Sequence, residues 1–580
     1  MIELYDFATL AASVERALAG VVGEGATAFE VTIPPRPEHG DVSANAALVN
    51  PGRVGLKPRE LAERLGAAWL AGEGGAVCDR YEVAGPGFLN IFLSRGWYRG
   101  AVQRMLDVGA DYGRGVLPPV ERRRVNVEFV SVNPTGPLHV GHARYASYGD
   151  CVCRLFAFVG HEVTREFYVN DYGTQMAKFG QSLAARYAQR FGIDFPVPDD
   201  GYRGEYVADF AGQLAAEVGD RYRAAVAAAA PDTDRLPADV VDALKTWGCD
   251  HVLGIFRATL QRMRVPFDVW KSEASLYEGD EAQVAHRGFV GEVGKALAEM
   301  DAEGLLYDSE GAVWLRTTAY GDDKDRVLVR QTGEPTYFLS DIAYHRDKLD
   351  RGFEHLIDIW GADHHGYVPR MKAAFTALPP HDPDALELII GQMVNLMESG
   401  EMKRMSKRKG EIVTVDGLLD AIGVDAARFS LVARSHDSTL DLDLDLAVQE
   451  SGKNPVYYVQ YAHARICSVL HNLAEKEGAR PPQAGQTLPE VALAAEERAL
   501  VKTLSRFPLV VLDAARRRAP HRLYAYLGDV AAEFHAFYRS CRVLTDDADV
   551  SAFRAALCVA TRNALASGLN LLGVSAPEHM

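Results

Sequence analysis

Two short segments of the sequence carry the residue types with the clearest chemistry. The first, residues 133–142, reads Asn-Pro-Thr-Gly-Pro-Leu-His-Val-Gly-His and places His139 three positions before His142. It follows a β-branched run and precedes an apolar helical pattern, which predicts a loop between a parallel strand and a helix. Such a loop presents backbone N–H groups and the positive end of the helix dipole to an anion, so it predicts phosphate binding. A metal-binding histidine pair, or one histidine that caps the helix, would give the same spacing.

The second segment is a basic run that follows an apolar strand pattern near Ile390. Residues 402–410 read Met-Lys-Arg-Met-Ser-Lys-Arg-Lys-Gly, with five cations from Lys403 to Lys409. Clustered cations stabilise a polyphosphate whose negative charge grows during a reaction. An isolated run of this kind is more often a solvated basic loop. It therefore indicates polyphosphate binding only when it is considered together with the first segment.

A third group, Asp363-His364-His365, raises the question of a metal site. No third ligand stands at a suitable spacing, and no Cys-x-x-Cys pair occurs among the seven scattered cysteines. The sequence therefore predicts neither a protein-bound metal nor a disulfide framework, and this cysteine usage is typical of a reducing compartment.

The elements that must position these residues alternate between strands and helices. Strand patterns at 125–130 and 163–169 flank a helix pattern at 141–159, which predicts a parallel sheet with a right-handed crossover. Further strand patterns occur at 312–316, 327–330, 355–360 and 386–390, and a strand-like stretch lies at 412–415. Residues from about 175 to 300 are Ala-rich and helical, which predicts an insertion in the sheet domain.

The two ends of the chain show different patterns. Residues 1–115 combine a helix pattern at 6–22 with an alternating strand at 87–93, which predicts an α+β unit. Residues 451–580 show only helices. We therefore predict three domains: 1–115, 116–450 with the helical insertion, and 451–580.

Composition narrows the function classes. The chain of 580 residues is 48% hydrophobic and 24% charged, which excludes a mostly disordered or fibrous protein. Its net charge of −17 excludes a uniformly basic nucleic-acid coat protein, although residues 451–580 hold 15 Lys and Arg against 12 Asp and Glu. A polyanion can therefore bind only through local patches. No apolar run reaches transmembrane length, so no membrane partner is expected.

Together, the two segments resemble the paired signatures of class I aminoacyl-tRNA synthetases. His139-Val140-Gly141-His142 corresponds to the HIGH motif, and Arg404-Met405-Ser406-Lys407-Arg408 to the KMSKS motif. Residues 127–139, 337–345, 360–366 and 454–465 narrow the resemblance to arginyl-tRNA synthetases. Arg404 and Arg408 depart from the motif's first lysine and last serine. Because Arg404 keeps the charge without the ammonium geometry, we expect a quantitative change rather than loss of activity.

The resemblance implies a multidomain α/β protein. Its expected parts are a Rossmann-like, doubly wound catalytic domain, an N-terminal domain that contacts the tRNA elbow, and a C-terminal all-α bundle that binds the anticodon. It implies a cytoplasmic arginine–tRNA ligase, expected as a monomer, whose partners are L-arginine, ATP and the tRNA for arginine. Mg²⁺ is expected to arrive with ATP as a substrate complex, and arginine activation is expected only with tRNA bound.

The resemblance also assigns roles to residues. His139, His142 and Lys407 are expected to contact the phosphates and stabilise the leaving pyrophosphate. The remaining ATP candidates are Pro134, Thr135, Gly136, Leu138, Gly141, Asp363, His364, Gln392, Met393, Met405 and Ser406. The arginine candidates are Glu128, Ser131, Asn133, Tyr337 and Asp341. A planar cation needs facing carboxylates, which Asp341 and Glu128 could supply, although either could also form a structural ion pair.

The tRNA candidates are Tyr457, Tyr461, Arg465 and Arg516, for base stacking and phosphate contacts. Buried tyrosines and a solvated arginine run are the alternative for these residues. Three rival functions also stay open: a class I synthetase of another amino-acid specificity, a non-catalytic tRNA-binding paralogue, and a small-molecule nucleotidyltransferase. The Glu128/Asp341 pair argues against the first, the intact motifs against the second, and the helical residues 451–580 against the third.

Overall fold

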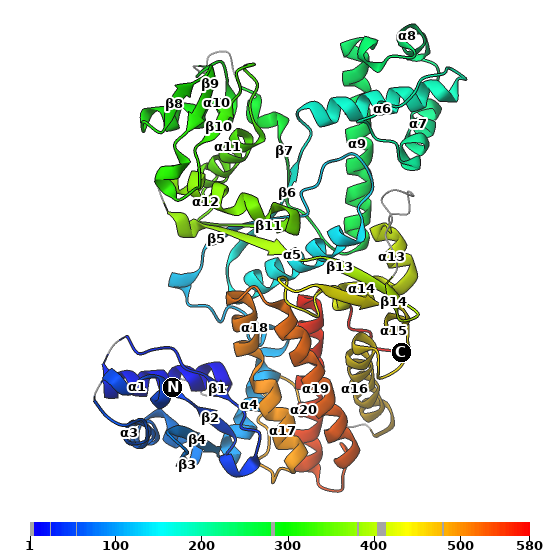
Figure 1. Cartoon of the computed structure of the whole chain (residues 1–580). Coiled ribbons are helices and arrows are strands. Elements are labelled where there is room, and N and C mark those ends of the chain that lie inside the picture. Colours follow the sequence, from blue (N-terminus) through cyan, green and yellow to red (C-terminus); the bar gives the residue numbers. More distant parts are fainter. Residues whose placement is uncertain are drawn as a thin grey trace. The chain divides into compact units, whose positions relative to one another are not determined.

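The computed structural model describes residues 5–23, 25–53, 55–279, 285–379, 382–402, 413–477 and 481–580. The chain divides into two compact units, whose elements are labelled in Figure 1. We call residues 120–157 and 161–448 the central unit, and residues 1–119, 158–160 and 449–580 the terminal unit. The terminal unit therefore combines the first and the last of the three predicted segments.

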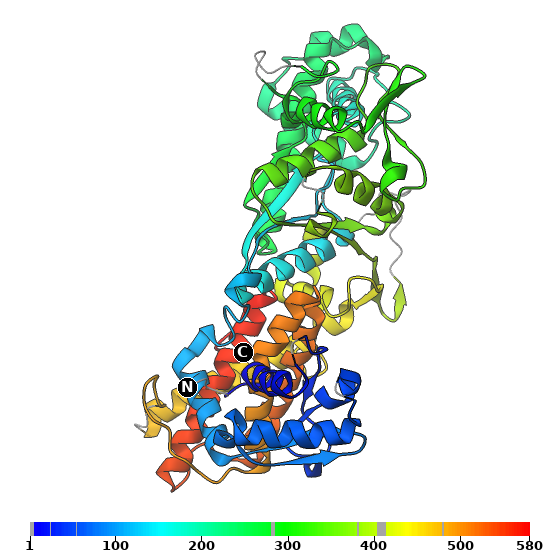
Figure 2. The same cartoon turned by 90° about the vertical axis from the view of Figure 1, so that its left-hand side faces the viewer.

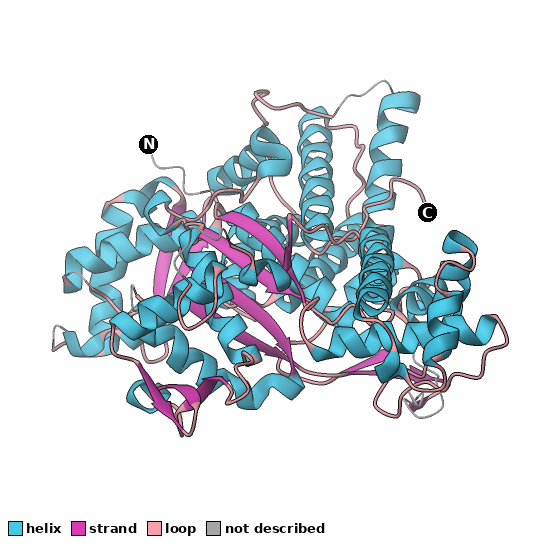
Figure 3. Ribbon diagram, turned by 90° about the horizontal axis from the view of Figure 1, so that it is seen from above, coloured by secondary structure: helices cyan, strands magenta, loops and turns pink. Residues whose placement is uncertain are grey.

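A five-stranded parallel sheet forms the centre of the central unit (Figure 3). Its strands are β5 (Arg124–Phe129), β6 (Glu162–Val169), β7 (Val269–Ser272), β11 (His355–Gly361) and β12 (Leu386–Gly391). The strand order is β12-β11-β5-β6-β7, so the winding reverses between β5 and β11. At such a reversal the loops leave in opposite directions, and the carboxyl ends of the strands border a crevice where α/β proteins bind ligands.

The two faces of β5 carry side chains of opposite character, because neighbouring residues of a strand point to opposite sides. Phe129 packs against α5 (Val140–Val159), and a Cβ added at Gly149 of that helix would lie 2.4 Å from its ring. Glu128 points to the other face, which is covered by α11 (Tyr337–Asp350) through a hydrogen bond from Lys348. Helices on both faces confirm the predicted doubly wound architecture.

The helical insertion is shorter than predicted. It comprises α6 (Thr174–Arg190), α7 (Glu205–Val218), α8 (Arg223–Ala229) and α9 (Ala238–Arg262), and then β7 rejoins the sheet beside β6. The pattern missed β7 because its four residues are all half-buried and show no alternation. α10 (Gly291–Ala302) follows.

Two smaller sheets lie outside the parallel one. The patterns at 312–316 and 327–330 belong to β9 (Ala312–Leu315) and β10 (Arg326–Val329), which form an antiparallel sheet with β8 (Leu306–Ser309). The second sheet has the order β14-β13-β15, from β13 (Val394–Glu398), β14 (Glu401–Met402) and β15 (Leu440–Asp443). The expected strand at 412–415 is not formed over its described part, since Thr414 makes one bridge and α13 (Val415–Ile422) begins directly after it.

The terminal unit packs a small sheet against a helical bundle. The sheet has the order β1-β2-β4-β3, from β1 (Val31–Thr32), β2 (Val42–Ala44), β3 (Cys78–Ala84) and β4 (Phe88–Leu93). Its main helices are α1 (Phe7–Val22), α3 (Pro58–Ala71) and α4 (Arg95–Val108). The bundle contains α16 (Pro455–Glu477), α17 (Ala495–Ser505), α18 (Phe507–Arg516), α19 (Pro520–Ser540) and α20 (Ala548–Leu571). α4 contacts α17 and α20, and Figure 2 shows the blue elements beside the orange and red helices.

One buried carboxylate joins the two parts of the terminal unit. Asp41 accepts hydrogen bonds from the Tyr98 hydroxyl at 2.7 Å and from the Leu93 N–H at 2.9 Å. It also pairs with Arg498 and Lys502 of α17, each at 3.3 Å. Within the described ranges, no helix is long and apolar enough to cross a membrane.

Candidate active site

The loop after β5 begins with a strained backbone. Val130 and Ser131 have φ angles of 69° and 36°, in the left-handed region that a β-branched residue rarely adopts. Neighbouring residues hold this conformation, because the Ser131 hydroxyl accepts from the Tyr168 N–H at 3.0 Å and its carbonyl accepts from the Asn170 amide at 3.3 Å. Strain that the surroundings enforce in this way clusters at ligand sites.

The two histidines stand together where this loop enters α5. Their rings stack with 3.5 Å between centroids, and the His139 N–H donates to Nδ1 of His142 at 3.2 Å. Because Nδ1 accepts, a neutral His142 ring carries its proton on Nε2, which can donate to a phosphate oxygen. A glycine at position 141 suits this packing, since a Cβ there would lie 3.0 Å from the His139 ring and would force the ring to shift. In the same loop Pro134 and Leu138 are buried, whereas Thr135 and Gly136 are half-buried.

The residues that follow the basic segment lie against the histidine segment. Lys407, Met405 and Ser406 fall in residues 403–412, which lie outside the described residues. The residues that follow are described: Val413 accepts from the Val140 N–H at 3.1 Å, and the Val415 N–H donates to the Leu138 carbonyl at 2.9 Å. The chain therefore leaves the basic segment beside His139.

A fully buried ion pair holds α5 against the helices that follow the basic segment. Nη2 of Arg428, on α14 (Val424–Leu431), lies 2.5 Å from Oδ2 of Asp150 on α5, and both side chains are 0% exposed. The same carboxylate contacts Arg154 at 2.6 Å and Arg165 at 3.4 Å. Since α13 and α14 continue directly from Val413, this cluster fixes the flank of the basic segment relative to the histidines.

The other ATP candidates lie at the carboxyl ends of β11 and β12. Asp363 and His364 are exposed in a short 3-10 helix, with 3.7 Å between Oδ2 and Nε2. Arg144 of α5 donates to the carbonyls of Gln392 and Met393 at 2.9 and 3.2 Å, which ties β12 to the histidine helix. Met393 is 61% exposed, so its side chain offers an adaptable apolar surface for a flat base.

The arginine candidates divide between β5 and α11. Asp341 lies one turn after Tyr337 on α11 and accepts a hydrogen bond from the Tyr367 hydroxyl, while Tyr337 itself is 52% exposed. Burial raises the pKa of Asp341, and the Tyr367 hydrogen bond opposes that rise. Glu128 uses Oε2 to accept from Lys348 at 2.6 Å, so the structural ion pair considered from sequence is present at one of its two oxygens. Asn133, on the loop, donates to Gln175 at 2.5 Å.

Two further polar residues belong to this side of the site, and the sequence did not identify them. The buried Tyr168 hydroxyl, on β6, has no hydrogen-bond partner among the described residues and interacts electrostatically with Glu128, Glu273 and Asp341. Glu273, directly after β7, is 2% exposed, and its Oε2 also lacks a partner within the described part. Burial raises the pKa of its carboxyl to about 7, with Asp341 and Asp171 adding to the rise. Both residues follow the rule that ligand groups gather at the carboxyl ends of parallel strands.

The tRNA candidates on α16 form a continuous strip. The rings of Tyr457 and Tyr461 stack with centroids 5.9 Å apart, and the Arg465 guanidinium lies 4.7 Å from the centre of the Tyr461 ring. All three side chains are half-buried, which leaves part of each accessible. Arg516 is exposed on a different helix, α18, so the structure groups three of the four candidates.

Three family models match the chain in the order of its parts. The arginyl-tRNA synthetase N-terminal domain matches residues 8–93, the class I (R) catalytic domain matches 108–197 and 247–472, and the DALR anticodon-binding domain matches 459–580. An arginine–tRNA ligase of Desulforudis audaxviator is 46% identical, over 99% of this chain and 100% of its own. One of Syntrophotalea carbinolica is 44% identical over 95% of each chain. This chain belongs to the arginyl-tRNA synthetase family.

The predictions of the family, of the fold class and of a class I synthetase catalytic domain are therefore confirmed. The solved arginyl-tRNA synthetase of Thermus thermophilus has the same fold, with a TM-score of 0.74 and 22% identity over 100% of both chains. The catalytic family model skips residues 198–246, which hold α7, α8 and the start of α9. Among the described residues of this synthetase chain, no group of three His, Cys, Asp or Glu side chains could hold a metal ion.

Proposed function

We propose that the chain is an arginine–tRNA ligase whose activation step takes place in the crevice between the ends of β5 and β11. The arginine carboxylate attacks the α-phosphorus of ATP, and pyrophosphate leaves. The 3′-terminal adenosine hydroxyl of tRNA then attacks the arginyl carbonyl, and AMP leaves. The reaction needs no covalent enzyme nucleophile, so the chain contributes positioning and charge stabilisation.

The roles follow from the positions described above. His142, with its Nε2 proton, and His139 would contact the phosphates at the start of α5, and Lys407 would neutralise the developing pyrophosphate. Met393, together with Asp363 and His364, would border the nucleotide. Asp341 and Glu128 would pair with the guanidinium, helped by Tyr337, while Ser131 and Asn133 would orient the α-amino and carboxylate end. Mg²⁺ would be bound by the ATP phosphates, since a hard cation of this kind prefers phosphate oxygens and water over a dedicated protein cage.

The observation that carries this proposal is the hydrogen bonding of the histidine segment to Val413 and Val415. It brings the described residues that follow the basic segment against the histidine segment, although the two stand far apart along the chain. ATP–pyrophosphate exchange with each amino acid, with and without tRNA, tests it. We expect exchange with arginine alone, and only when tRNA is present. Exchange with another amino acid would reassign the pocket, and no exchange by folded protein that binds tRNA would favour a non-catalytic paralogue.

We propose the monomer as the working form and residues 1–115 as the part that contacts the tRNA elbow. We also propose the strip Tyr457, Tyr461 and Arg465 as a place for unpaired anticodon bases. The stacked rings beside a guanidinium support this role, because base stacking on aromatic side chains contributes about 1–3 kcal/mol per base. The cytoplasm is the proposed compartment. The seven cysteines support it, since all are free thiols and six are buried.

Glu273 predicts a pH dependence of arginine binding. Its carboxyl, with a pKa of about 7, is mostly neutral at pH 6 and mostly ionised at pH 8, so the attraction for a guanidinium grows as pH rises. The KM for arginine should fall by up to about tenfold over this interval, in proportion to the ionised fraction. In Glu273→Gln that dependence should disappear. The KM for ATP, measured in the same series, is the control. If the KM for arginine changed equally with pH in wild type and in Glu273→Gln, Glu273 would not be the group that causes the pH dependence.

A further inference from the structure

A row of carboxylates crosses the parallel sheet beneath α11. Asp358 on β11 is the register partner of Glu128 on β5, and Glu128 is the register partner of Glu166 on β6. Partners in register on neighbouring strands point to the same face, so three acidic side chains stand next to one another inside the protein. All three are nearly or fully buried. Unpaired charges in such a place would be strongly destabilising, so each must have a cation close by.

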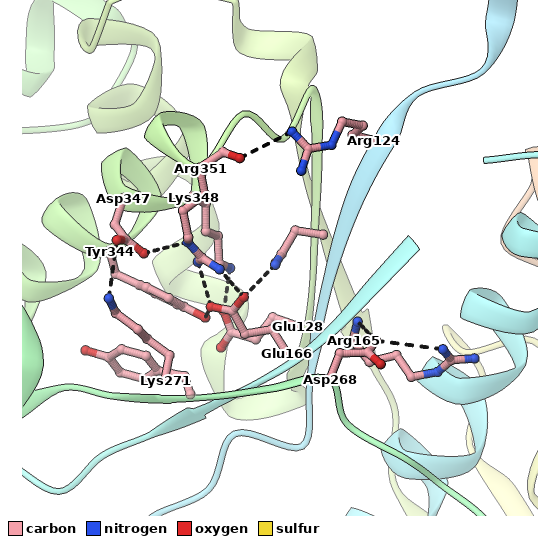
Figure 4. Close-up of polar contacts among 12 residues, drawn as sticks. Arg124, Glu128, Arg165, Glu166, Asp268, Lys271, Tyr344, Asp347, Lys348 and Arg351 are labelled. Carbon is pink, nitrogen blue, oxygen red and sulfur yellow. Dashed lines mark hydrogen bonds and ion pairs between the residues drawn. The ribbon is translucent and has the colours of Figure 1, made fainter. Parts of the chain in front are cut away.

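α11 and Arg351, the residue that caps its C-terminus, supply these cations, as Figure 4 shows for most of the cluster. Lys348 is 0% exposed, and its ammonium donates to Glu128 at 2.6 Å and to Asp358 at 2.8 Å. Arg351 binds both oxygens of Glu166, at 2.7 and 2.8 Å, and the Tyr344 hydroxyl donates to the same carboxylate at 2.8 Å. The two cations have different roles, because Arg351 binds Glu166, which is not a substrate candidate, whereas Lys348 contacts the substrate candidate Glu128 directly.

The second partner of Lys348 leads to the other substrate candidate. Asp358 contacts Nε2 of His345 at 2.7 Å, and Nδ1 of His345 lies 2.7 Å from the carbonyl oxygen of Asp341. An imidazole that bonds to a carboxylate and to a carbonyl at the same time carries a proton on both nitrogens. In agreement, the pKa of His345 is raised: burial lowers it, but the neighbouring Asp358 carboxylate more than offsets that effect. The chain of contacts Glu128–Lys348–Asp358–His345 therefore runs from the Glu128 carboxylate to the backbone carbonyl of Asp341, the residue that carries the second carboxylate proposed to bind guanidinium.

The charges of this cluster leave room for one more cation. Glu128, Glu166 and Asp358 form ion pairs with Lys348, Arg351 and His345, three carboxylates with three cations. Asp341 is a fourth carboxyl, which accepts a hydrogen bond from Tyr367 and forms no ion pair with a described residue. The hydrogen bond from Lys348 uses Oε2 of Glu128, which leaves Oε1 as the acceptor for that additional cation. A substrate guanidinium has the required charge and hydrogen-bonding geometry.

We propose that Lys348 is a positioning residue that sets the affinity for arginine, because its ammonium fixes Glu128 in one rotamer, balances its charge and directs the second oxygen to the substrate. The proposal rests on the proposed arginine-activating function. Without the ammonium, Glu128 would share a buried site with Asp358 and Glu166 and would take up a proton. Burial already raises the pKa of Glu128, and Lys348 is the nearest group that opposes the rise. Arginine could then bind only after Glu128 had lost this proton.

The test is Lys348→Met, a change that keeps the length of the side chain and removes its charge. We expect the KM for arginine at pH 7.5 to rise about 30-fold or more, with the KM for ATP within about twofold of wild type. The ratio of variant to wild-type KM should fall by up to about tenfold per pH unit towards pH 9.5, as Glu128 ionises. Calorimetry of arginine binding in buffers of different ionisation enthalpy should show more protons released on binding to the variant than to wild type, with the difference approaching one. A purely structural role would move neither the pH profile nor the proton count.

Two variants complete the design. Lys271→Met is the matched control: Lys271 lies on β7, pairs with Asp347 at 3.2 Å, and should change the KM for arginine by less than threefold. Lys348→Met with Asp358→Asn removes one positive and one negative charge, so we expect it to fold even if the single variant does not. Its KM for arginine should still exceed that of wild type, because Glu128 lacks the ammonium that positions it, but the rise should be smaller because the Asp358 charge no longer favours a protonated Glu128. An unchanged KM for arginine in a folded variant would overturn the proposal. If wild-type protein itself shows no arginine-dependent exchange, the proposed function fails instead.

Discussion

Asp341→Asn should lower kcat/KM for arginine by roughly 100-fold or more, mostly through KM. The substitution keeps the size of the side chain but removes the charge that a planar cation needs. A hydrogen bond to a charged group contributes about 1.5–3 kcal/mol, and a bidentate pair has two of them. Pyrophosphate exchange at varied arginine concentration, with saturating ATP and tRNA, measures this change in kcat/KM.

The same carboxylate offers a matched control in its hydrogen-bond donor. Tyr367→Phe removes the hydroxyl that donates to Asp341 and leaves the carboxylate in place. We expect a loss of tenfold or less, because the charge remains available at neutral pH. If Asp341→Asn left the KM for arginine near the wild-type value while raising the KM for ATP, the arginine would bind elsewhere in the crevice.

Asp150→Asn should lower the free energy of unfolding of the central unit by about 3–5 kcal/mol. Removing one partner of a buried ion pair leaves the other charge uncompensated, which costs this amount in comparable cases. Here the uncompensated group is Arg428, whose guanidinium is 0% exposed and otherwise donates to the Met263 carbonyl at 2.8 Å. Urea unfolding followed by tryptophan fluorescence measures the change.

The control for this variant uses a cation of the same cluster that water can reach. Arg154 is 22% exposed at its side chain, so Arg154→Met should cost only about 1 kcal/mol or less. We also expect Asp150→Asn to slow arginine activation at temperatures where the protein stays folded, because the pair holds α14 against the histidine helix. Equal destabilisation by the two variants would show that burial of Arg428 does not govern the energy of the cluster.

The motifs on long, regular elements could be predicted from the sequence. The run from β5 through His142 into α5 combines a β-branched strand, a Pro- and Gly-rich loop and an apolar helix, and each of these is a local signal. The same holds for β11 and β12, which place Asp363 and Met393 at strand ends. The backbone hydrogen bonds of Val413 with Val140 and of Val415 with Leu138 could be anticipated only from the family resemblance, since neither segment alone encodes them.

Glu273 and Lys348 could not be predicted, for two different physical reasons. Glu273 follows β7, a short edge strand whose half-buried residues show no alternation, so the strand that positions it was not recognised. Lys348 stands in the sequence His-Arg-Asp-Lys-Leu-Asp-Arg, which has the composition of a solvated helix surface. Its burial depends on two carboxylates, Glu128 on β5 and Asp358 on β11, because a lysine is buried only where such partners exist.

The terminal unit has a consequence for how the protein is made. Its sheet and α4 come from the first residues to be synthesised, but their packing partners on α17 and α20 come last. Asp41 and Arg498 are 457 positions apart. At about 5–20 residues per second, a ribosome needs roughly half a minute to a minute and a half to reach the second partner. During that interval the face of α4 that contacts the bundle stays uncovered, and the Asp41 carboxylate lacks both of its cations.

We expect this uncovered apolar face of α4, which includes Trp97, Val102 and Met105, to be bound by chaperones until the chain is nearly complete. A chain that stops before α17 would keep that face exposed permanently, which marks truncated products for proteolysis.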